Sequence, residues 1–492
     1  MIIDLERLTN LSIYPASVSE GNGITYFLGR RGAGEAGKFV GSVGEGGLVG
    51  EIMAKVDGQP IIVAPANHVN AMVIRNVLPW TAPVCLGLAT SAGLGDRLGL
   101  ATPGHIRAMR SSGQGLRPIL AQQSIREMTR TQRTPEEVMD CATWGVLQEG
   151  WREGFGSDAD HLQQPEGIDS TVAAGFTMFT IDPGQHVNNA ADTMDGPSLL
   201  AECEKLDFDT LSITIDHLRG EYLGKTFPLA DGGKIEFDEA RLLRAAVKYG
   251  NAVAHTAKMY RHLAKARQRP FELEVSVDET QSPTTPAEHF FFASELVRLG
   301  VKWVSMAPRF IGRFEKGVDY IGPLAAFRKS FKEHVAVMRT LGPYKMSIHS
   351  GSDKFSIYPI VAELTEGLVH LKTAGTSYLE ALRAVAKIDP KLFRDILDFA
   401  RAHYETDKAS YHVSADLRKV KPASSLTDAK LAAVLEDFHA RQALHVTFGS
   451  VLTEGGGARF RKRLLAALAA SEEVYYGVLE KHLGRHLAPF AR

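Results

Sequence analysis

A short stretch near the middle of the chain, residues 271–280, alternates acidic and hydroxyl side chains with apolar ones. Glu274, Ser276 and Asp278 fall on one face of the predicted β-strand, and apolar side chains fall on the other. Amphipathic helical patterns flank the strand, which is typical of a parallel sheet covered on both faces. Carboxylates buried there need a metal, a cation or a substrate to offset their desolvation. The strand is therefore a candidate functional site.

The same period of two places polar side chains on one face of several other predicted strands. These residues are Thr180 and Asp182, Thr214 and Asp216, Ser305 and Arg309, Lys345, Ser347 and His349, and His370 and Lys372. Barrel enzymes carry their sites at the carboxyl ends of their strands, so we expect these side chains to converge. Taken singly, an Asp that closes a strand can simply cap the next turn. Polar faces on five strands in register are hard to explain as a core.

A further predicted strand, residues 158–162, contains Asp158, Asp160 and His161, but its pattern does not decide which of them face inward. Two carboxylates and one or two imidazoles from different strands form a site for a divalent ion such as Mn²⁺, Zn²⁺, Ni²⁺ or Co²⁺. The cations available to bind an anionic substrate, each of which could instead be a surface charge, are Arg97, Arg309, Lys354 and Lys372.

The composition limits the classes of protein to which the chain can belong. With 492 residues and 44% hydrophobic content, it can form one large domain with additions, or two domains. A formal net charge of −1 favours neither nucleic acid nor a membrane surface as a partner. Only three cysteines, no leader pattern and no long apolar run predict a cytoplasmic protein. The expected partner is a small molecule, and a homo-oligomer stays open.

The elements that must position these residues fall into three predicted regions. Residues 1–80 are a glycine-rich β segment, residues 81–375 alternate strand and helix, and residues 376–492 read as a helical extension. The stretch 32–38 matches two nucleotide-binding patterns at first sight. It opens no sustainable helix, however, and it lacks the Ser or Thr of a P-loop, so neither match is kept.

The alternating region predicts a (β/α)8 barrel in the α/β class, because regular alternation over so long a stretch is unusual in an open sheet. Two of its helices have clear start signals, beginning at Thr134 and Thr285, each followed by Pro and by Glu at the third position. Nine strands are predicted where eight are needed, so either the first or the 158–162 strand should lie outside the ring. The predicted strands are 84–88, 118–122, 158–162, 176–182, 211–216, 272–278, 303–307, 345–350 and 368–372.

Several longer motifs resemble the tagaturonate/fructuronate epimerase family. They are Gly95-Asp-Arg-Leu-Gly99, Phe179-Thr-Ile-Asp182, Glu274-Val-Ser-Val-Asp-Glu279, Ala307-Pro-Arg-Phe310, Gly312-Arg-Phe-Glu-Lys-Gly317, Ser347-Ile-His-Ser-Gly-Ser-Asp-Lys-Phe-Ser356 and Lys372-Thr-Ala-Gly-Thr-Ser-Tyr378. The similarity extends from about residue 80 to the C-terminal helices. It implies a metal-dependent epimerase of hexuronate catabolism that interconverts D-tagaturonate and D-fructuronate.

The implied reaction inverts C4, which is β to the C2 ketone, so abstraction of an α proton cannot achieve it. A retro-aldol route can: a base removes the C4 hydroxyl proton, the C3–C4 bond breaks, the aldehyde turns over and the bond re-forms. This chemistry requires a Lewis acid and acid/base groups. Strand parity favours Asp216, Glu274, His349 and His370 as metal ligands, and Asp182 and Asp278 as the acid/base pair. The substrate carboxylate would be held by a cation, Arg97, Arg309, Lys354 or Lys372, with Ser124 and Thr180 as neutral contacts.

Two alternatives remain at this point. A class II metal-dependent aldolase acting on a sugar acid or ketose would cleave the same bond but release the fragments. A non-catalytic sugar-acid binding protein would keep the barrel without turnover, although the density of inward ionisable groups argues against it. The sequence also leaves open whether His349 binds the metal or the substrate.

Overall fold

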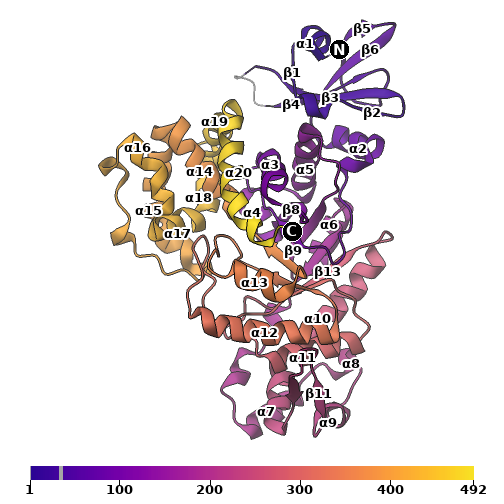
Figure 1. The fold of residues 1–492 in the computed structure, drawn as a ribbon, viewed down its shortest axis with the longest axis vertical. Helices are drawn as coiled ribbons and strands as arrows, with labels where there is room; N and C mark the ends of the chain where they lie inside the picture. The colour runs from indigo at the N-terminus through magenta and orange to yellow at the C-terminus, as the bar shows by residue number, and fades with distance from the viewer. Residues whose placement is uncertain (1, 33–36) are drawn as a thin grey trace.

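The computed structural model describes residues 2–32 and 37–492, which form three successive parts (Figure 1). An antiparallel sheet comes first, a closed barrel of parallel strands follows, and helices make up the rest. The predicted fold class, a (β/α)8 barrel with an N-terminal β segment and a helical C-terminal extension, is confirmed. Within the described residues, no helix has both the length and the apolar composition needed to cross a bilayer.

The N-terminal sheet is built on the glycine-rich part of the sequence. Its strands are β1 (Ser12–Ile13), β2 (Ser19–Gly21), β3 (Ile24–Arg30), β4 (Lys38–Val43), β5 (Glu51–Val56) and β6 (Gln59–Pro65), with helices α1 (Ile2–Thr9) and α2 (His68–Val77) beside them. The connection between β3 and β4 contains the rejected nucleotide motif, of which residues 33–36 lie outside the described residues. Tyr26 and Leu28 of β3 pack with Trp144 of the barrel, which ties the sheet to it.

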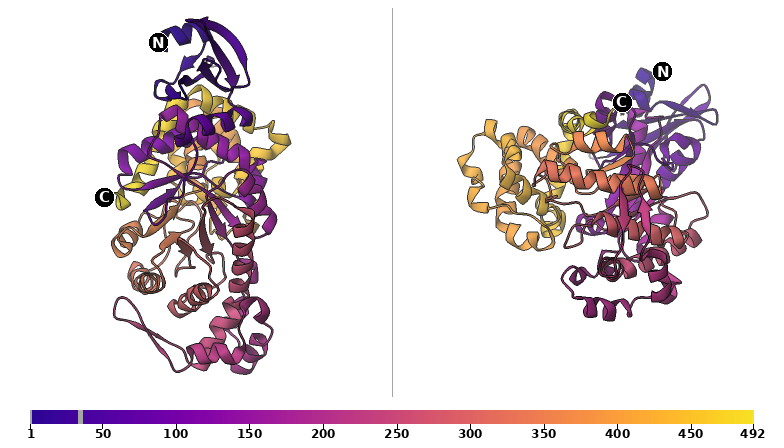
Figure 2. Two further views of the ribbon diagram at one scale, coloured as in Figure 1. Left: turned by 90° about the vertical axis from the view of Figure 1, so that its right-hand side faces the viewer. Right: turned by 60° about the horizontal axis from the view of Figure 1, so that its bottom comes forward.

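Eight parallel strands close the barrel (Figure 2). They are β7 (Ser91–Gly93), β8 (Arg117–Ser124), β9 (Gly156–Leu162), β10 (Met178–Ile181), β13 (Glu272–Ser276), β14 (Ser305–Ala307), β15 (Lys345–Ile348) and β16 (Val369–Lys372). Each strand pairs with the next along the chain, and β16 returns to β7 to close the ring. Their carboxyl ends therefore meet at one mouth.

Two of the nine predicted strands are wrong. Residues 84–88 form no strand, and the first barrel strand is Ser91–Gly93 instead, whereas the 158–162 strand belongs to the ring. Residues 211–216 lie in an excursion, where α8 (Phe208–Leu211) ends and α9 (Ile215–Tyr222) begins. The hydroxyl of Thr214 accepts a hydrogen bond from the backbone N–H of His217 and caps α9. The cap residue Thr214 and Asp216 in the first turn of α9 are spaced two apart, which is also the spacing of polar residues on one face of a strand.

Helices cover the outside of the barrel. They are α3 (Thr102–Ser112), α4 (Ile125–Thr131), α5 (Pro135–Glu149), α6 (Pro165–Ala173), α10 (Glu239–Ala266), α11 (Pro286–Arg298), α12 (Leu324–Leu341) and α13 (Tyr358–Thr365). The two predicted start signals are confirmed as capping boxes at Thr134 and Thr285. Between β10 and α10, the excursion with α7 (Gly196–Cys203), α8, α9, β11 (Thr226–Pro228) and β12 (Lys234–Glu236) extends from the end of the molecule opposite the N-terminal sheet (Figure 1).

The C-terminal helices pack on one side of the barrel (Figure 1). They are α14 (Thr376–Ile388), α15 (Pro390–Asp407), α16 (Asp428–Leu431), α17 (Phe438–Val446), α18 (Phe448–Thr453), α19 (Arg461–Ala470) and α20 (Glu472–Leu487). Helix α20 runs against α3, where a Cβ atom at Gly104 would lie 2.7 Å from Leu479 Cδ1. This close crossing needs the glycine and fixes the extension on the barrel.

Candidate active site at the barrel mouth

Glu274 of β13 is a fully buried carboxylate at the carboxyl end of the barrel. Its Oε1 atom is 2.6 Å from His349 Nε2, 2.6 Å from Lys372 Nζ and 3.2 Å from Thr180 Oγ1. Its Oε2 atom has no hydrogen-bond partner among the described residues. Burial would raise the pKa of Glu274, but Lys372 and His349 hold it well below its usual value. Glu274 is therefore an anion with one free oxygen.

Lys372, the last residue of β16, places its ammonium among oxygens from several strands. Its Nζ atom is 2.8 Å from Asp158 Oδ2, 2.7 Å from Asp160 Oδ1 and 2.8 Å from Thr180 Oγ1, in addition to Glu274. Burial lowers the pKa of Lys372, but the three carboxylates outweigh it and raise that pKa well above its usual value. Three carboxylates around one lysine leave an excess of negative charge that favours a further cation.

Two imidazoles face each other beside this group, and each is held by a carboxylate. His161 Nδ1 is 3.1 Å from Asp182 Oδ2, and His349 Nδ1 is 3.3 Å from Asp278 Oδ1. The ring centroids are 5.1 Å apart, with the rings edge to face. Burial lowers the pKa of His349, but Asp278 and Glu274 outweigh it and raise that pKa to about 9. The carboxylates thus fix both ring orientations and leave the Nε2 atoms facing Asp160 and Glu274.

A bulge in β9 explains why strand parity could not place Asp158, Asp160 and His161. The register of β9 against β10 shifts there, and His161 has a left-handed backbone with φ of 52°. A bulge brings two successive residues to the same side of a strand. Asp160 and His161 therefore both line the pocket at the mouth, while Asp158 reaches Lys372 from a deeper level.

The residues at the mouth fit a divalent metal ion. Asp160, His161 and His349, here called the mouth cluster, each offer one ligand atom, and these atoms all lie within 4.8 Å of one another. The donor set mixes imidazole nitrogen with carboxylate oxygen, as borderline divalent ions prefer. Histidines that bind metals commonly donate their other ring N–H to a carboxylate, which is the arrangement of both His161 and His349. The Glu274 carboxylate adjoins the cluster. Its Oε1 atom contacts His349, and its Oε2 atom has no hydrogen-bond partner among the described residues.

A second group with similar side chains lies between the loop after β15 and α20. It consists of Asp353, His482 and His486, here called the α20 cluster. Asp353 Oδ1 is 2.6 Å from His482 Nε2, and Asp353 Oδ2 is 2.7 Å from Arg441 Nη2. His486 Nε2 accepts the backbone N–H of Asp353 at 2.9 Å. The protein itself occupies these ligand atoms, so the α20 cluster fastens the extension to the barrel.

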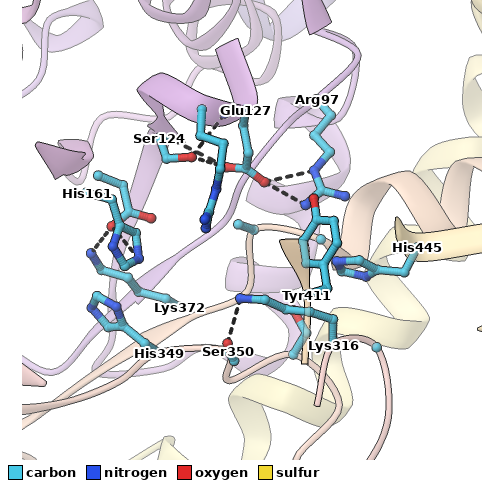
Figure 3. Close-up of a pocket in the computed structure, with 16 residues that line it drawn as sticks. Arg97, Ser124, Glu127, His161, Lys316, His349, Ser350, Lys372, Tyr411 and His445 are labelled. Atoms are coloured by element: carbon cyan, nitrogen blue, oxygen red, sulfur yellow. Dashed lines mark hydrogen bonds and ion pairs between the residues drawn. The ribbon is translucent and has the colours of Figure 1, made fainter. Parts of the chain in front are cut away.

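A pocket of about 590 Å³, mouth included, opens beside the mouth cluster. Figure 3 shows His161, His349 and Lys372 on one side of it and Arg97, Tyr411 and His445 on the other; the last two come from the C-terminal extension.

Cations at the pocket differ in whether they are already paired. Arg97 Nη2 is 2.6 Å from Glu127 Oε1, and its guanidinium lies 3.7 Å from the ring centroid of Phe448. Lys316 Nζ donates to Ser350 Oγ at 2.7 Å, and no carboxylate among the described residues lies within 4.0 Å of it. Lys316 is therefore the lysine at this pocket that has its charge free for a substrate (Figure 3).

The structure gathers most of the residues predicted for the site. Around the mouth and its pocket lie Arg97, Ser124, Thr180, Asp182, Glu274, Asp278, His349 and Lys372. His370 lies two residues deeper in β16, where its Nδ1 is 2.9 Å from Ser91 Oγ; burial lowers its pKa to about 3. Arg309 lines the adjoining pocket and donates to the backbone oxygen of Thr280.

Two predicted positions do not reach the site. Asp216 lies in the first turn of α9 with its side chain 90% exposed, so the prediction that it points into the barrel is wrong. Lys354 is buried away from the pocket and donates to the backbone oxygens of Glu315, Val318 and Ser352. Those carbonyls use all three of its protons, so the structure does not place it as a substrate contact.

Several residues of the pocket were not predicted. Lys316 belongs to the Gly312–Gly317 motif and lines the pocket. The side-chain pattern of this motif predicts no strand, so it could not show that Lys316 points inward. Glu127 is a capping-box residue of α4, and its role in pairing Arg97 depends on tertiary contact. Tyr411 and His445 come from the helical extension, far from the barrel in sequence. No local signal marks such residues.

Comparison with known proteins agrees with the fold. A sequence profile described as tagaturonate epimerase matches residues 14–490. A tagaturonate/fructuronate epimerase from Thermotoga maritima is 44% identical over 475 residues, covering 96% of each chain. A glycerol-complexed crystal structure of fructuronate-tagaturonate epimerase from Cohnella laeviribosi has a TM-score of 0.91 at 37% identity, covering 99% of this chain and 98% of that chain. Its native form has the same TM-score at 38% identity.

Proposed function

The chain belongs to the tagaturonate epimerase family, and on this premise we propose that it inverts C4 of a ketouronate and so interconverts D-tagaturonate and D-fructuronate. The observation that carries the proposal is the mouth cluster beside Glu274 and Lys372, at the carboxyl end of a closed barrel. The group combines ligand atoms, a charged proton carrier and an adjoining pocket. The free cysteines fit a reducing compartment, which supports a cytoplasmic enzyme.

Asp160, His161, His349 and Glu274 would hold one divalent ion, Mn²⁺, Zn²⁺, Ni²⁺ or Co²⁺. When bound, the ion would act as a Lewis acid toward the C2 ketone. This assignment replaces the exposed Asp216 and the deep His370 with Asp160 and His161. Asp182 and Asp278, first expected as an acid/base pair, would instead position the imidazoles through their Nδ1 atoms.

Lys372 and Asp158 would form the proton relay. Lys372 lines the pocket and is 2.8 Å from Asp158, so it can accept the C4 hydroxyl proton as it passes one of its own to Asp158. As that proton leaves, the C4 carbonyl forms, the C3–C4 bond breaks, and its electron pair moves to C3 and the C2 oxygen. The aldehyde turns over, the bond re-forms on its other face, and the relay returns the proton.

The substrate carboxylate would bind Lys316, with Ser124 and the paired Arg97 as further polar contacts. Lys316 suits this role because it has no carboxylate partner among the described residues, whereas Arg97 is neutralised by Glu127. Lys316→Met should therefore raise KM for tagaturonate about tenfold, as expected for a hydrogen bond to a charged group, with kcat largely kept. The exposed Lys329→Met on α12 is the matched control, and an equal KM in both variants would contradict the assignment.

The activity itself is tested by incubating the purified protein with D-tagaturonate and following fructuronate by NMR, before and after treatment with a chelator. Epimer formation that stops on chelation and returns with Mn²⁺, Zn²⁺, Ni²⁺ or Co²⁺ is the expected result. Accumulation of three-carbon products would identify an aldolase instead, and full activity after exhaustive metal removal would refute the metal assignment.

The route is tested by the same reaction in D₂O. Retro-aldol cleavage keeps hydrogen on C4, because only the hydroxyl proton and the C3–C4 bond are involved. Deuterium at C4 of the product would therefore exclude this route.

A further inference from the structure

A second cavity lies away from the barrel mouth, between the N-terminal sheet, α5 and the last two helices. Its volume, mouth included, is about 1040 Å³. Tyr14 and Lys38 line it from the sheet side, Trp144 from α5, and Glu472 and Tyr476 from α20. None of the residues proposed for epimerisation lines this cavity, so its chemistry can be considered independently.

The acid of the cavity is already satisfied. The Glu472 carboxylate accepts hydrogen bonds from the Tyr14 hydroxyl at 3.1 and 3.0 Å and from the Tyr476 hydroxyl at 3.2 Å. It also pairs with Arg30, whose Nε atom is 3.4 Å from Oε1. One carboxylate thus serves one arginine and two hydroxyls. Each of its two oxygens already has two partners, so Glu472 is not available to a second cation.

Lys38, at the start of β4, is that second cation. Its Nζ atom donates to the neutral Gln148 Oε1 and lies 5.5 Å from the ring centroid of Tyr14. Within the described part of the chain, no carboxylate lies within 4.0 Å of this ammonium. Burial lowers the pKa of Lys38 by more than Glu472 and the other acids nearby raise it. An anion that entered the cavity would relieve the cost of this burial.

The remaining walls are largely apolar. Leu100, Pro103 and Leu468 line the cavity, together with the large ring of Trp144. A polyhydroxylated sugar acid would lose hydrogen bonds to water against such walls, whereas an apolar or planar body would gain by burial. We propose that this cavity binds a small organic acid with an apolar or aromatic body and one negative charge, with the anion at Lys38.

The test uses two fluorescent probes that share the same rings but differ in charge. 8-Anilinonaphthalene-1-sulfonate is an anion, and N-phenyl-1-naphthylamine is its uncharged counterpart. The full chain should bind one equivalent of the anion, and Lys38→Gln should weaken its binding about tenfold, the loss expected for a hydrogen bond to a charged group, while leaving the neutral probe unchanged. Lys55→Gln, an exposed lysine on β5 of the same sheet, is the matched control and should bind the anion normally.

A second variant, Ala466→Trp, fills the cavity from its rim and should weaken the binding of both probes. Epimerase turnover and a thermal melt show that each variant is folded. The proposal is overturned if wild type binds no anionic probe, if Lys38→Gln binds it as tightly as wild type, or if tagaturonate displaces it. No residue proposed for epimerisation lines this second cavity. A negative epimerase assay would therefore leave the result of the probe-binding experiment valid.

Discussion

The mouth cluster and the α20 cluster contain the same kinds of side chain, two histidines with one aspartate, yet they differ in what their polar atoms contact. In the α20 cluster, Arg441, His482 and a backbone N–H occupy the ligand atoms of Asp353 and His486. In the mouth cluster, carboxylates hold the Nδ1 atoms, and Glu274 and Lys372 contact His349 Nε2 and Asp160 Oδ1, but all three residues of the cluster line an open pocket.

The difference shows that residue type alone does not make a site. Buried polar groups are normally satisfied within the protein, as in the α20 cluster, so atoms left free beside a cavity are the informative ones. Among the described residues, Glu274 Oε2 is such an atom, and Lys316 donates to the neutral Ser350 hydroxyl and has no carboxylate partner. Substitutions at the mouth should therefore affect turnover, and those in the α20 cluster should affect stability.

The largest effect is expected from Lys372→Gln, which removes the proton relay at the mouth. Turnover should fall about 10³-fold, within the range for loss of a positioned acid or base. Steady-state kinetics measure the loss, and circular dichroism checks the fold. Lys345→Gln is the matched control, because Lys345 is a buried barrel lysine that binds Ser91 and does not line the pocket. Similar turnover in both variants would remove Lys372 from the mechanism.

Asp353→Asn should chiefly lower stability, by about 3 kcal/mol, because it leaves Arg441 with a weakened partner in a buried site. Urea unfolding measures this change, and turnover per folded molecule should be nearly unchanged.

The difference in stability between wild type and Asp353→Asn should depend on pH. Burial would raise the pKa of Asp353, but Arg441 and His482 hold it well below its usual value. The stabilisation is therefore present above pH about 4 and is lost as the pH falls further, so wild type and Asp353→Asn should converge in acid. A stability gap that stays constant from pH 7 to pH 3 would contradict the ion pair.

A smaller effect is expected from Asp182→Asn, which disturbs the orientation of His161 without removing a ligand. Affinity for the activating divalent ion should weaken about 10- to 100-fold, as for other partners of metal-binding histidines. Calorimetric titration of the metal-free protein with the divalent ion measures this affinity. His486→Gln, from the α20 cluster, should bind the ion as wild type does; if it is affected instead of Asp182→Asn, the metal assignment belongs to the other cluster.

The smallest effect is expected from Asp216→Asn. Its side chain is 90% exposed and pairs only loosely with Arg219 at 3.8 Å, so unfolding free energy should change by less than about 0.5 kcal/mol. Metal stoichiometry and turnover should match wild type. Loss of the ion in this variant would restore Asp216 as a ligand and undo the assignment based on the structure.

Strand parity predicted much of the fold and part of the site. Glu274 and Lys372 lie within regular strands and His349 directly follows one, so an unbroken period of two placed all three on the inner face. The same rule failed for Asp216, where a helix cap imitated a strand. It could not decide on His161, because a bulge breaks the period there.

What the sequence by itself determined is the barrel, the inward carboxylates and the family, since these depend on local alternation and on motifs that lie within single elements. Only the tertiary structure decided how the charged groups are paired. Arg97 pairs with Glu127, three carbonyls surround Lys354, and Lys316 has no carboxylate partner within the part of the chain that the structure describes. The physical reason is that the state of a buried charge depends on partners brought from distant parts of the chain.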